Sequence, residues 1–465
     1  MKLSKLFLIS LAACILASCS KDDDISGPSE VDAYISIAAS TGVMTKSYTK
    51  GNDEGEEDPS PLTDPGTGKE AVVKSLTAYV FDTADKWVVT KHVSMAVDEN
   101  GQKFTAEGVS GEDYTVNVNG SINSIKGIHV KVARPEQTNG ASASTFKVVL
   151  LANVEKLTVA TLEDLQSKSI PEITTYSDLN NTSKAVGQTY LPMHNGEVLN
   201  IGGLKPSLFD NNGKETKHVL NWYVGSGSSV QEELDLSNGD EVHTGTTPKG
   251  TAVELIRSLS RIQLKSLNAS FVSQYIGYIF WVESISLVNV RATSTVLGEE
   301  SEESSFYGGF SDDFTIIQHL INKDETQVDN FKKKYTNLAL MNNFTSETPL
   351  NFDTYINVNS PESQEGITVG SDGQQQEGAY QTRLIIKGNL KDINKNNIGT
   401  KYFHIPLKMK DVQGNVACNK FFQITATITG EGNPNPDEIL ENTCINFQIT
   451  VQNWNVVKQE ENDVN

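Results

Sequence analysis

The chain has 465 residues, enough for two or three domains, and 37% of them are apolar, so a sizeable buried core can form. Its formal net charge is −21, and loss of Lys2 and Lys5 with a signal peptide would make it −23. This acidic balance excludes nucleic acid as a partner, because phosphate binding needs a basic surface. It is typical of a secreted, self-repelling protein surface.

The N-terminus is typical of a bacterial lipoprotein signal peptide. Residues 1–5 carry two lysines, residues 6–16 form an uncharged and mostly apolar run, and small residues stand directly before Cys19. The apolar run is too short for a mature membrane span and fits a secretory signal. We therefore expect residues 1–18 to be removed and Cys19 to carry a lipid. An ordinary signal peptide with an incidental cysteine is the alternative.

A tether, a strand and an acidic loop follow the signal peptide. Residues 20–33 are mostly polar, and residues 34–46 predict a weak strand in which Ile35 and Ile37 alternate with small neighbours. Residues 47–70 are rich in Gly, Pro, Asp and Glu. Because this composition cannot bury a core, we expect a flexible acidic loop there.

The remainder predicts a mainly β protein with two β-sandwich-like (transthyretin-like) domains and a few short helices. Strand-length apolar runs recur, and Asn-Gly dipeptides, which favour tight hairpins, lie between them. Strands are expected at 76–81, 87–89, 146–151, the second half of 253–267, 278–290, 380–387 and 421–429. The best helix candidates are 159–167 and 315–340. We place an N-terminal domain at 71–270 and a C-terminal domain at 271–465.

The sequence contains no recognisable catalytic, cofactor-binding or metal-binding pattern. Its seven histidines are scattered, and the glycine patterns of nucleotide-binding loops and hydrolase elbows are missing. Residues 98–101 and 210–213 begin like calcium loops but lack the ligand spacing of an EF-hand, so we interpret them as hairpin turns. We therefore expect no enzyme activity and no cofactor.

Two of the four cysteines, Cys418 and Cys444, would remain unmodified in a lipidated mature chain. They could form a disulfide in an oxidising compartment, or they could be two separate buried thiols. No CxxC motif supports a redox or zinc site.

The C-terminal segment has the clearest strand pattern. Alternate residues are apolar, with one phase shift at Asn453: Ile445, Phe447, Ile449, Val451, Trp454 and Val456. At ~3.3 Å per residue, residues 445–457 would span roughly 43 Å, which is long for a globular domain. The pattern fits an ordinary last strand and a strand donated to another subunit equally well.

Several segments together resemble the fimbrillin family of Bacteroidales, the type V pilins, and most closely the shaft subunit of the minor fimbriae. They are the lipoprotein-like N-terminus, the strands at 76–81 and 146–153, the basic strand at 255–262 and the terminal strand at 451–457. Each match is loose, but their order and spacing extend the resemblance over nearly the whole chain.

The resemblance implies an assembly mechanism. Such pilins are exported as lipoproteins, and a trypsin-like protease then cuts the loop after the first strand. This cut frees that strand with its lipid, and the C-terminal strand of another copy fills the empty groove. By position, Lys46-Ser47 matches the processed bond. Well-known members have Arg there, so cleavage at Lys50, Lys69 or Lys74 is the alternative.

On this interpretation, residues 19–46 form a lipidated propeptide with a displaceable first strand, and the C-terminal strand is the donor. Each buried large apolar side chain contributes about 1.5–3 kcal/mol, so the donor is the stronger insert by several kcal/mol. The expected partners are other copies of the chain, fimbrial anchor and tip subunits, and the processing protease. The expected location is a fimbrium on the cell surface.

Other functions remain open. An anchor or tip subunit of the same family would be a different fimbrial role, and an anchor would keep its lipid. A surface lipoprotein that binds glycans or other ligands would not polymerise, and an enzyme would need an unrecognised site. The resemblance also implies a role in adhesion, but no residue identifies a receptor.

Overall fold

The computed structural model describes residues 29–43, 68–241 and 252–457, apart from 100–101, 137–139, 173–175, 177–178, 180–186, 302–305, 308–330, 346–347, 360–381, 408–415, 435–443 and 455. The predicted lipidation site Cys19 and the predicted processing bond Lys46-Ser47 lie outside these residues. In the described part, no helix is long and apolar enough to cross a membrane.

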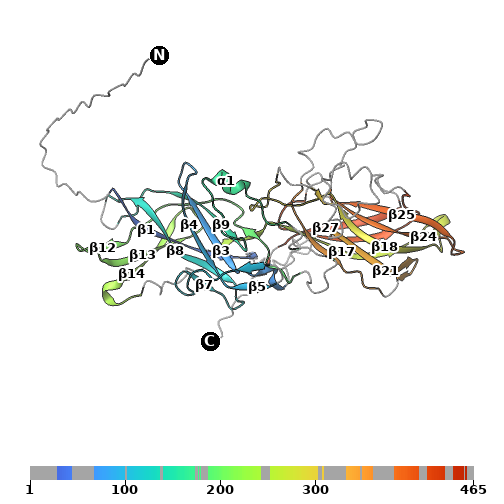
Figure 1. Cartoon of the computed structure of the whole chain (residues 1–465), viewed down its shortest axis with the longest axis horizontal. Helices are drawn as coiled ribbons and strands as arrows, with labels where there is room; N and C mark the ends of the chain where they lie inside the picture. Colours follow the sequence, from blue (N-terminus) through green and yellow to red (C-terminus); the bar gives the residue numbers. More distant parts are fainter. Residues whose placement is uncertain are drawn as a thin grey trace, which may run out of the picture.

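Strands dominate the structure, as predicted. Figure 1 shows two groups of strands that follow one another along the long axis of the molecule. The N-terminal group uses strands between residues 30 and 257, and the C-terminal group uses strands between residues 260 and 453. Each group contains two large sheets.

The first N-terminal sheet has the order β12–β13–β1–β8–β7, with β14 paired to β13 and β15 paired to β1. Its strands are β1 (Glu30–Ser40), β7 (Tyr114–Val116), β8 (Ile122–Ala133), β12 (Leu208–Phe209), β13 (Glu215–Tyr223), β14 (Ser229–Asp235) and β15 (Val253–Glu254). The second sheet has the order β16–β10–β9–β3–β4, with β11 paired to β9. Its strands are β3 (Ser75–Phe81), β4 (Trp87–Ser94), β9 (Phe146–Ala152), β10 (Met193–His194), β11 (Leu199–Ile201) and β16 (Ile256–Arg257).

The two C-terminal sheets have the orders β23–β17–β26–β27 and β22–β21–β18–β24–β25. The first contains β17 (Ser260–Ala269), β23 (Phe352–Ile356), β26 (Lys420–Ile428) and β27 (Ile445–Asn453). The second contains β18 (Ile279–Val288), β21 (Lys332–Met341), β22 (Phe344–Thr345), β24 (Arg383–Lys391) and β25 (Asn397–Pro406).

Short elements complete the described fold. They are β2 (Gly42–Val43), which pairs with β28 (Val456–Val457), β5 (Val97–Glu99) with β6 (Gln102–Phe104), β19 (Val290–Arg291) with β20 (Phe306–Tyr307), the helix α1 (Leu162–Ser167), and the 3-10 turns η1 (Gly68–Ala71), η3 (Leu236–Asn238) and η4 (Ser273–Tyr275). Thr161 caps α1 by accepting a hydrogen bond from the Asp164 N–H, which satisfies one of the free donors of the first turn. The predicted helix at 159–167 is therefore confirmed.

The alternation of apolar residues explains how the N-terminal sheets face each other. On β1, one face presents Ala33, Ile35, Ile37 and Ala39 to a buried cluster that also contains Leu76, Ala78 and Val80 of β3. Side chains of a strand alternate between its two faces, so Tyr79 and Phe81 point away from this cluster. They join a second cluster with Leu162 and Leu165 of α1.

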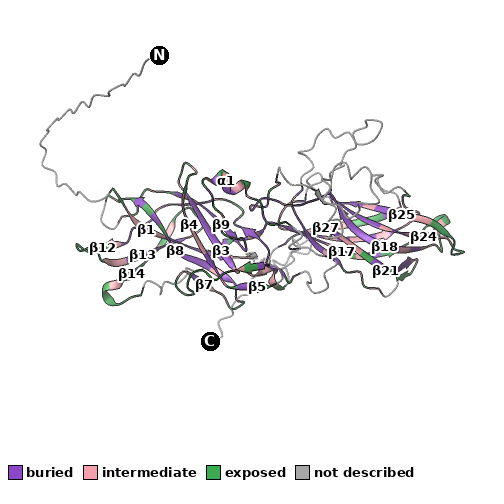
Figure 2. Cartoon of the chain, viewed as in Figure 1, coloured by how far each residue is buried: buried purple, intermediate pink, exposed green. Residues whose placement is uncertain are grey.

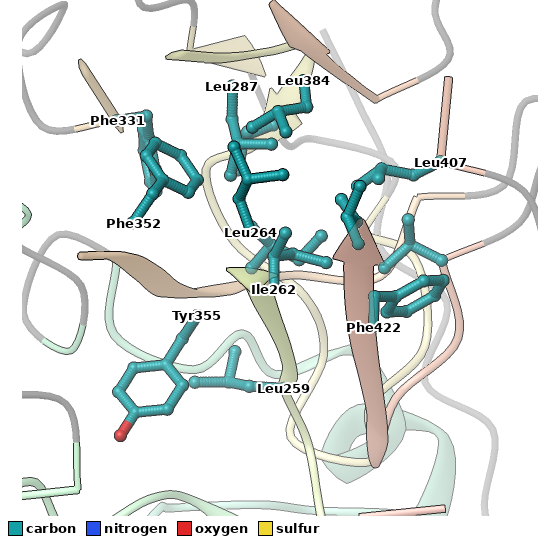
Figure 3. Close-up of a cluster of buried hydrophobic side chains, with 14 of the residues drawn as sticks. Leu259, Ile262, Leu264, Leu287, Phe331, Phe352, Tyr355, Leu384, Leu407 and Phe422 are labelled. Carbon is teal, nitrogen blue, oxygen red and sulfur yellow. The ribbon is translucent and has the colours of Figure 1, made fainter. Parts of the chain in front are cut away.

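This second cluster continues into the C-terminal group, where most of its residues lie. Figure 3 shows Leu259, Ile262 and Leu264 in a close-up of it, with Phe422 from the neighbouring strand β26 and Leu287 and Leu384 from the other C-terminal sheet. Figure 2 shows buried residues along the strands of both groups. The two groups therefore share apolar core across their junction.

The structure corrects two predictions. The region 315–340 is not one helix, because its described end belongs to β21 (Lys332–Met341), where buried Leu338 and Leu340 alternate. β16 pairs with β10 and β17 pairs with β23 and β26, so the chain passes from the N-terminal to the C-terminal sheets between Arg257 and Ser260, while the domain boundary near 270 stays a prediction. The C-terminal strand is not continuous, because β27 ends at Asn453 and β28 begins at Val456.

A buried histidine near the junction predicts acid sensitivity. His194 on β10 is 2% exposed, and burial lowers its pKa to about 4 from 6.5. Below pH 6.5 the unfolded chain gains a proton that the folded chain does not. The free energy of unfolding should therefore fall between pH 6.5 and pH 4, by up to about 3 kcal/mol, and level off below. His194→Gln should reduce this slope in urea denaturation.

The exposed His129 provides the control, because its side chain is 50% exposed. His129→Gln should retain the slope that His194 contributes. An identical pH dependence of wild type and His194→Gln would contradict the prediction.

Candidate functional site

The first strand of the chain lies inside a sheet rather than at its edge. β1 pairs antiparallel with β8, from Glu30 opposite Ala133 to Ala38 opposite Ser124. It also pairs parallel with β13 and, at its end, with β15. In the described sheet, β1 alone links β12–β14 to β7–β8. Its removal would leave unpaired backbone groups on both neighbours, which is a ready template for another strand.

The inner face of β1 is buried but small. Ala33, Ile35, Ile37 and Ala39 are each at most 3% exposed. The prediction that Ile35 and Ile37 lie on the apolar face of this strand is therefore confirmed. The strand starts before the predicted residue 34 and ends at Ser40. Because two of the four inner residues are alanines, β1 buries less apolar surface than its length allows.

The outer face of β1 is held by polar and aromatic contacts. The Tyr34 ring packs between the rings of His129 on β8 and His218 on β13, with centroid distances of 5.2 and 4.5 Å. Asp32 accepts a hydrogen bond from His129 Nε2 at 2.6 Å and pairs with Lys131. Its hydrogen bond from Lys131 is the main reason why the pKa of Asp32 lies below its ordinary value. Side chains of both neighbouring strands therefore contact β1 on this face.

The C-terminal strand occupies the edge of its own sheet. β27 pairs antiparallel with β26 from Lys420 opposite Asn453 to Ile428 opposite Ile445. The inward residues Ile449 and Val451 are only partly buried, and Phe447 is 36% exposed. The last strand is thus paired within the C-terminal sheet, and the side chains at 447, 449 and 451 are at most partly buried.

Among the five predicted donor residues whose burial the structure describes, those at 445 and 454 are deeply buried, at 5% and 0% exposure. Val456 lies in β28, whose backbone pairs in parallel with β2 at Gly42 and Val43. The tail beyond β27 therefore contacts the segment that directly follows β1.

Trp454 fills a socket at the junction of the two groups of strands. The Arg257 guanidinium lies 4.5 Å from the centre of its ring, and the Tyr355 ring stacks on it at 5.7 Å and 17°. Arg257 also donates to the Trp454 carbonyl, and the Trp454 N–H donates to the Asn419 carbonyl. Within the described residues, the buried Trp454 Nε1 has no hydrogen-bond partner, which weakens an otherwise complete fit.

Glu70 ties this socket together from the N-terminal side. Its carboxylate accepts from the Tyr355 hydroxyl at 2.7 Å and from Arg261 at 3.4 Å, and its carbonyl accepts from Arg257 Nε at 3.1 Å. Glu70 is fully buried. Burial and the Glu70 charge raise the pKa of Tyr355 well above its ordinary value, so its hydroxyl remains a donor.

A second carboxylate balances the arginines. Asp353 accepts two hydrogen bonds from Arg261, at 2.9 and 2.7 Å, and a third from Gln263. Two arginines and two carboxylates thus share the junction, which satisfies the requirement that buried charges be paired. Arg257 and Arg261 stood out in the sequence only as basic residues in an apolar strand. The sequence did not predict a buried role for Glu70, because this residue ends a segment whose composition predicts an exposed acidic loop.

Cys418 and Cys444 are free cysteines, so the disulfide does not form. They lie beyond opposite ends of β26, since Cys418 precedes Lys420 and the Cys444 carbonyl accepts from Thr429 N–H at 2.7 Å. A nine-residue strand spans roughly 30 Å, far more than the Cα separation of about 6 Å that a disulfide needs.

No cluster of three or more His, Cys, Asp or Glu residues in the described part could hold a metal ion. The predicted calcium-like segment at 210–213 is a turn in which Asp210 Oδ1 accepts from the backbone N–H groups of Asn212 and Lys214. The candidate site described here consists of strand pairing and side-chain docking contacts.

Comparison with known proteins agrees with this geometry. Residues 33–248, which include most of β1 and its neighbours β8 and β13, match the family described as major fimbrial subunit protein (FimA). Because of this match, we refer to residues 33–248 as the fimbrillin region. The strands on either side of β1, β8 and β13, lie within the fimbrillin region. A search of curated protein sequences finds no match.

Solved structures show the same fold over almost the whole chain. A fimbrilin from Porphyromonas gingivalis W83 has a TM-score of 0.54 at 14% identity, covering 92% of this chain and 99% of that one. A cell adhesion protein of Parabacteroides distasonis ATCC 8503 has a TM-score of 0.52 at 16% identity, covering 92% and 100%. The likeness therefore extends beyond the fimbrillin region to the C-terminal sheets.

The burial of Trp454 predicts that it anchors the last strand. Trp454→Ala should lower the free energy of unfolding by about 3–5 kcal/mol, because it empties a large buried site. The matched control is Phe447→Ala on the same strand, which should cost about 1 kcal/mol since its ring is 36% exposed. Urea denaturation measures both, and equal losses would contradict the assignment.

Proposed function

We propose that this chain is a structural pilin subunit of a surface fimbria that polymerises by strand exchange. It is exported as a lipoprotein through Cys19, cut after Lys46, and stripped of β1. The C-terminal strand of another copy then fills the groove between β8 and β13. The fimbrillin region supports the pilin role, and the docking contacts described above support a structural rather than a catalytic function.

The position of β1 is the observation that carries this proposal. A strand that precedes the predicted processing bond lies between two pairing partners, and its inner face carries only two large apolar side chains. Its loss would expose two sheet edges and an apolar groove in one step. Backbone pairing would let any strand enter, and pockets for alternate side chains would select the right one.

Side-chain size gives the exchange its direction. β1 offers two alanines and two isoleucines to the groove, whereas residues 445–451 offer Ile, Phe, Ile and Val at the corresponding alternate positions. Each additional buried methylene contributes about 0.8 kcal/mol. The partly buried Ile449 and Val451 also gain more from a deep groove than from an exposed sheet edge.

A reversible tether on β1 tests the strand exchange. Asp32 and Lys131 are opposite partners on β1 and β8, so Asp32→Cys with Lys131→Cys can form a disulfide on the outer face. After cleavage between Val43 and Gly68, the oxidised protein should remain monomeric because β1 cannot leave. The reduced form of the same preparation should polymerise. Fibres seen by electron microscopy from the oxidised protein would overturn the proposal.

Processing distinguishes a shaft subunit from an anchor. N-terminal sequencing of protein sheared from cells should begin at Ser47 if the chain builds the shaft. A start at Cys19 would indicate an anchor that keeps its lipid. Lys46→Gln should abolish the cut, whereas Lys50→Gln, which changes a nearby alternative lysine, should not. A start after Lys50, Lys69 or Lys74 would move the processed bond.

A further inference from the structure

The end of the β1 groove meets the socket of Trp454. Ser40, the last residue of β1, accepts a hydrogen bond from Leu255 N–H at 2.7 Å, and Thr41 Oγ1 donates to the Ala71 carbonyl at 3.0 Å. Arg257 lies two residues after Leu255 and Glu70 directly precedes Ala71, and both residues are walls of the socket. A strand that follows the path of β1 is therefore led to this junction.

The spacing of the donor strand matches this path. The inward residues of β1 are at positions 33, 35, 37 and 39, and those of the donor are at 445, 447, 449 and 451. If the two sets superpose, Trp454 falls three residues beyond the groove, at the position of Gly42. In the folded chain the backbone at Gly42 pairs with Val456, two residues after Trp454. The assumed superposition and the observed pairing of Gly42 with Val456 therefore agree on where Trp454 would lie.

We propose that the Trp454 socket is an exchange site shared between subunits. In the folded chain, Arg257, Tyr355 and Glu70 hold the chain's own Trp454. In the fibre, the same socket receives Trp454 from the neighbouring copy whose C-terminal strand fills the β1 groove. This inference rests on the proposed strand exchange. It assigns Trp454 as the residue that anchors the end of the donated strand.

The arrangement makes each subunit regulate its own acceptor site. While its own Trp454 is seated, the socket is closed to a neighbour, and its own strand is unavailable as a donor. Removal of β2 with β1 takes away the backbone partner of β28, so processing loosens the tail as it empties the groove. One event thus prepares both the donor and the acceptor end of the subunit.

Peptide binding to full-length chain cut after Lys46 tests the shared socket. Labelled peptides of residues 445–465 are titrated by fluorescence anisotropy into wild-type subunit and into the Trp454→Ala subunit, whose socket is vacant. The wild-type peptide should bind the Trp454→Ala subunit more tightly than the wild-type subunit. On the vacant socket, Trp454→Ala in the peptide should weaken binding about tenfold or more, as for a buried Trp anchor.

Two further peptides separate this inference from the proposed function. Phe447→Ala should weaken binding to both subunits because it faces the groove, and Gln448→Ala should not because it faces outward. Failure of every peptide to bind would overturn the strand exchange itself. Binding that depends on Phe447 but is equal with and without Trp454 would overturn only the shared socket.

A photo-crosslink gives a readout that does not require the Trp454→Ala subunit to fold. A peptide with benzoylphenylalanine at position 454 is bound to wild-type subunit, irradiated and mapped by mass spectrometry. Adducts on Tyr355, Arg257 or residues 70–71 are expected. Adducts confined to other segments would overturn the shared socket.

Discussion

The backbone pairing of β1 on both sides is the constraint on which the N-terminal sheets depend. β8 and β13 are joined through β1 in the described sheet, and its inner face closes the core over β3. Because backbone hydrogen bonds do not depend on side-chain identity, another strand can satisfy the same requirement. A sheet held together by a replaceable strand can be stable in the monomer and competent for assembly.

The junction adds specificity to this general pairing. Arg257, Arg261, Glu70 and Asp353 are paired around Tyr355 and Trp454, where the two groups of strands meet. Buried charges contribute little net stability, but they tolerate few alternative arrangements. The network therefore suits a socket that accepts one aromatic residue in one position, and it places that socket at the end of the β1 path.

The described residues contain a set of docking contacts and no group of side chains arranged for metal binding. Likeness to solved structures extends over the whole fold, whereas the family match is confined to residues 33–248. The C-terminal sheets thus share their fold with the relatives. The Trp454 socket draws residues from both parts of the chain, with Glu70 inside the matched residues and Tyr355 and Trp454 beyond them.

Periodicity in the sequence determined most strands. An alternation such as Phe422, Ile424 and Ala426 places the apolar side chains on one face of the strand, and that face packs into the core. It also singled out β1 and the C-terminal segment as strands with apolar faces. The helix expected at 315–340 was wrong at its described end, because a short apolar run of strand length fits either structure until its pairing partners are known.

Only the tertiary structure decided which strands are neighbours, that the last strand breaks before Trp454, and that Cys418 and Cys444 lie apart. It also brought Glu70 to Arg257 and Tyr355, at sequence separations of 187 and 285 residues. The physical reason is that periodicity reports which face of a strand is buried, whereas the partners across that face come from distant parts of the chain.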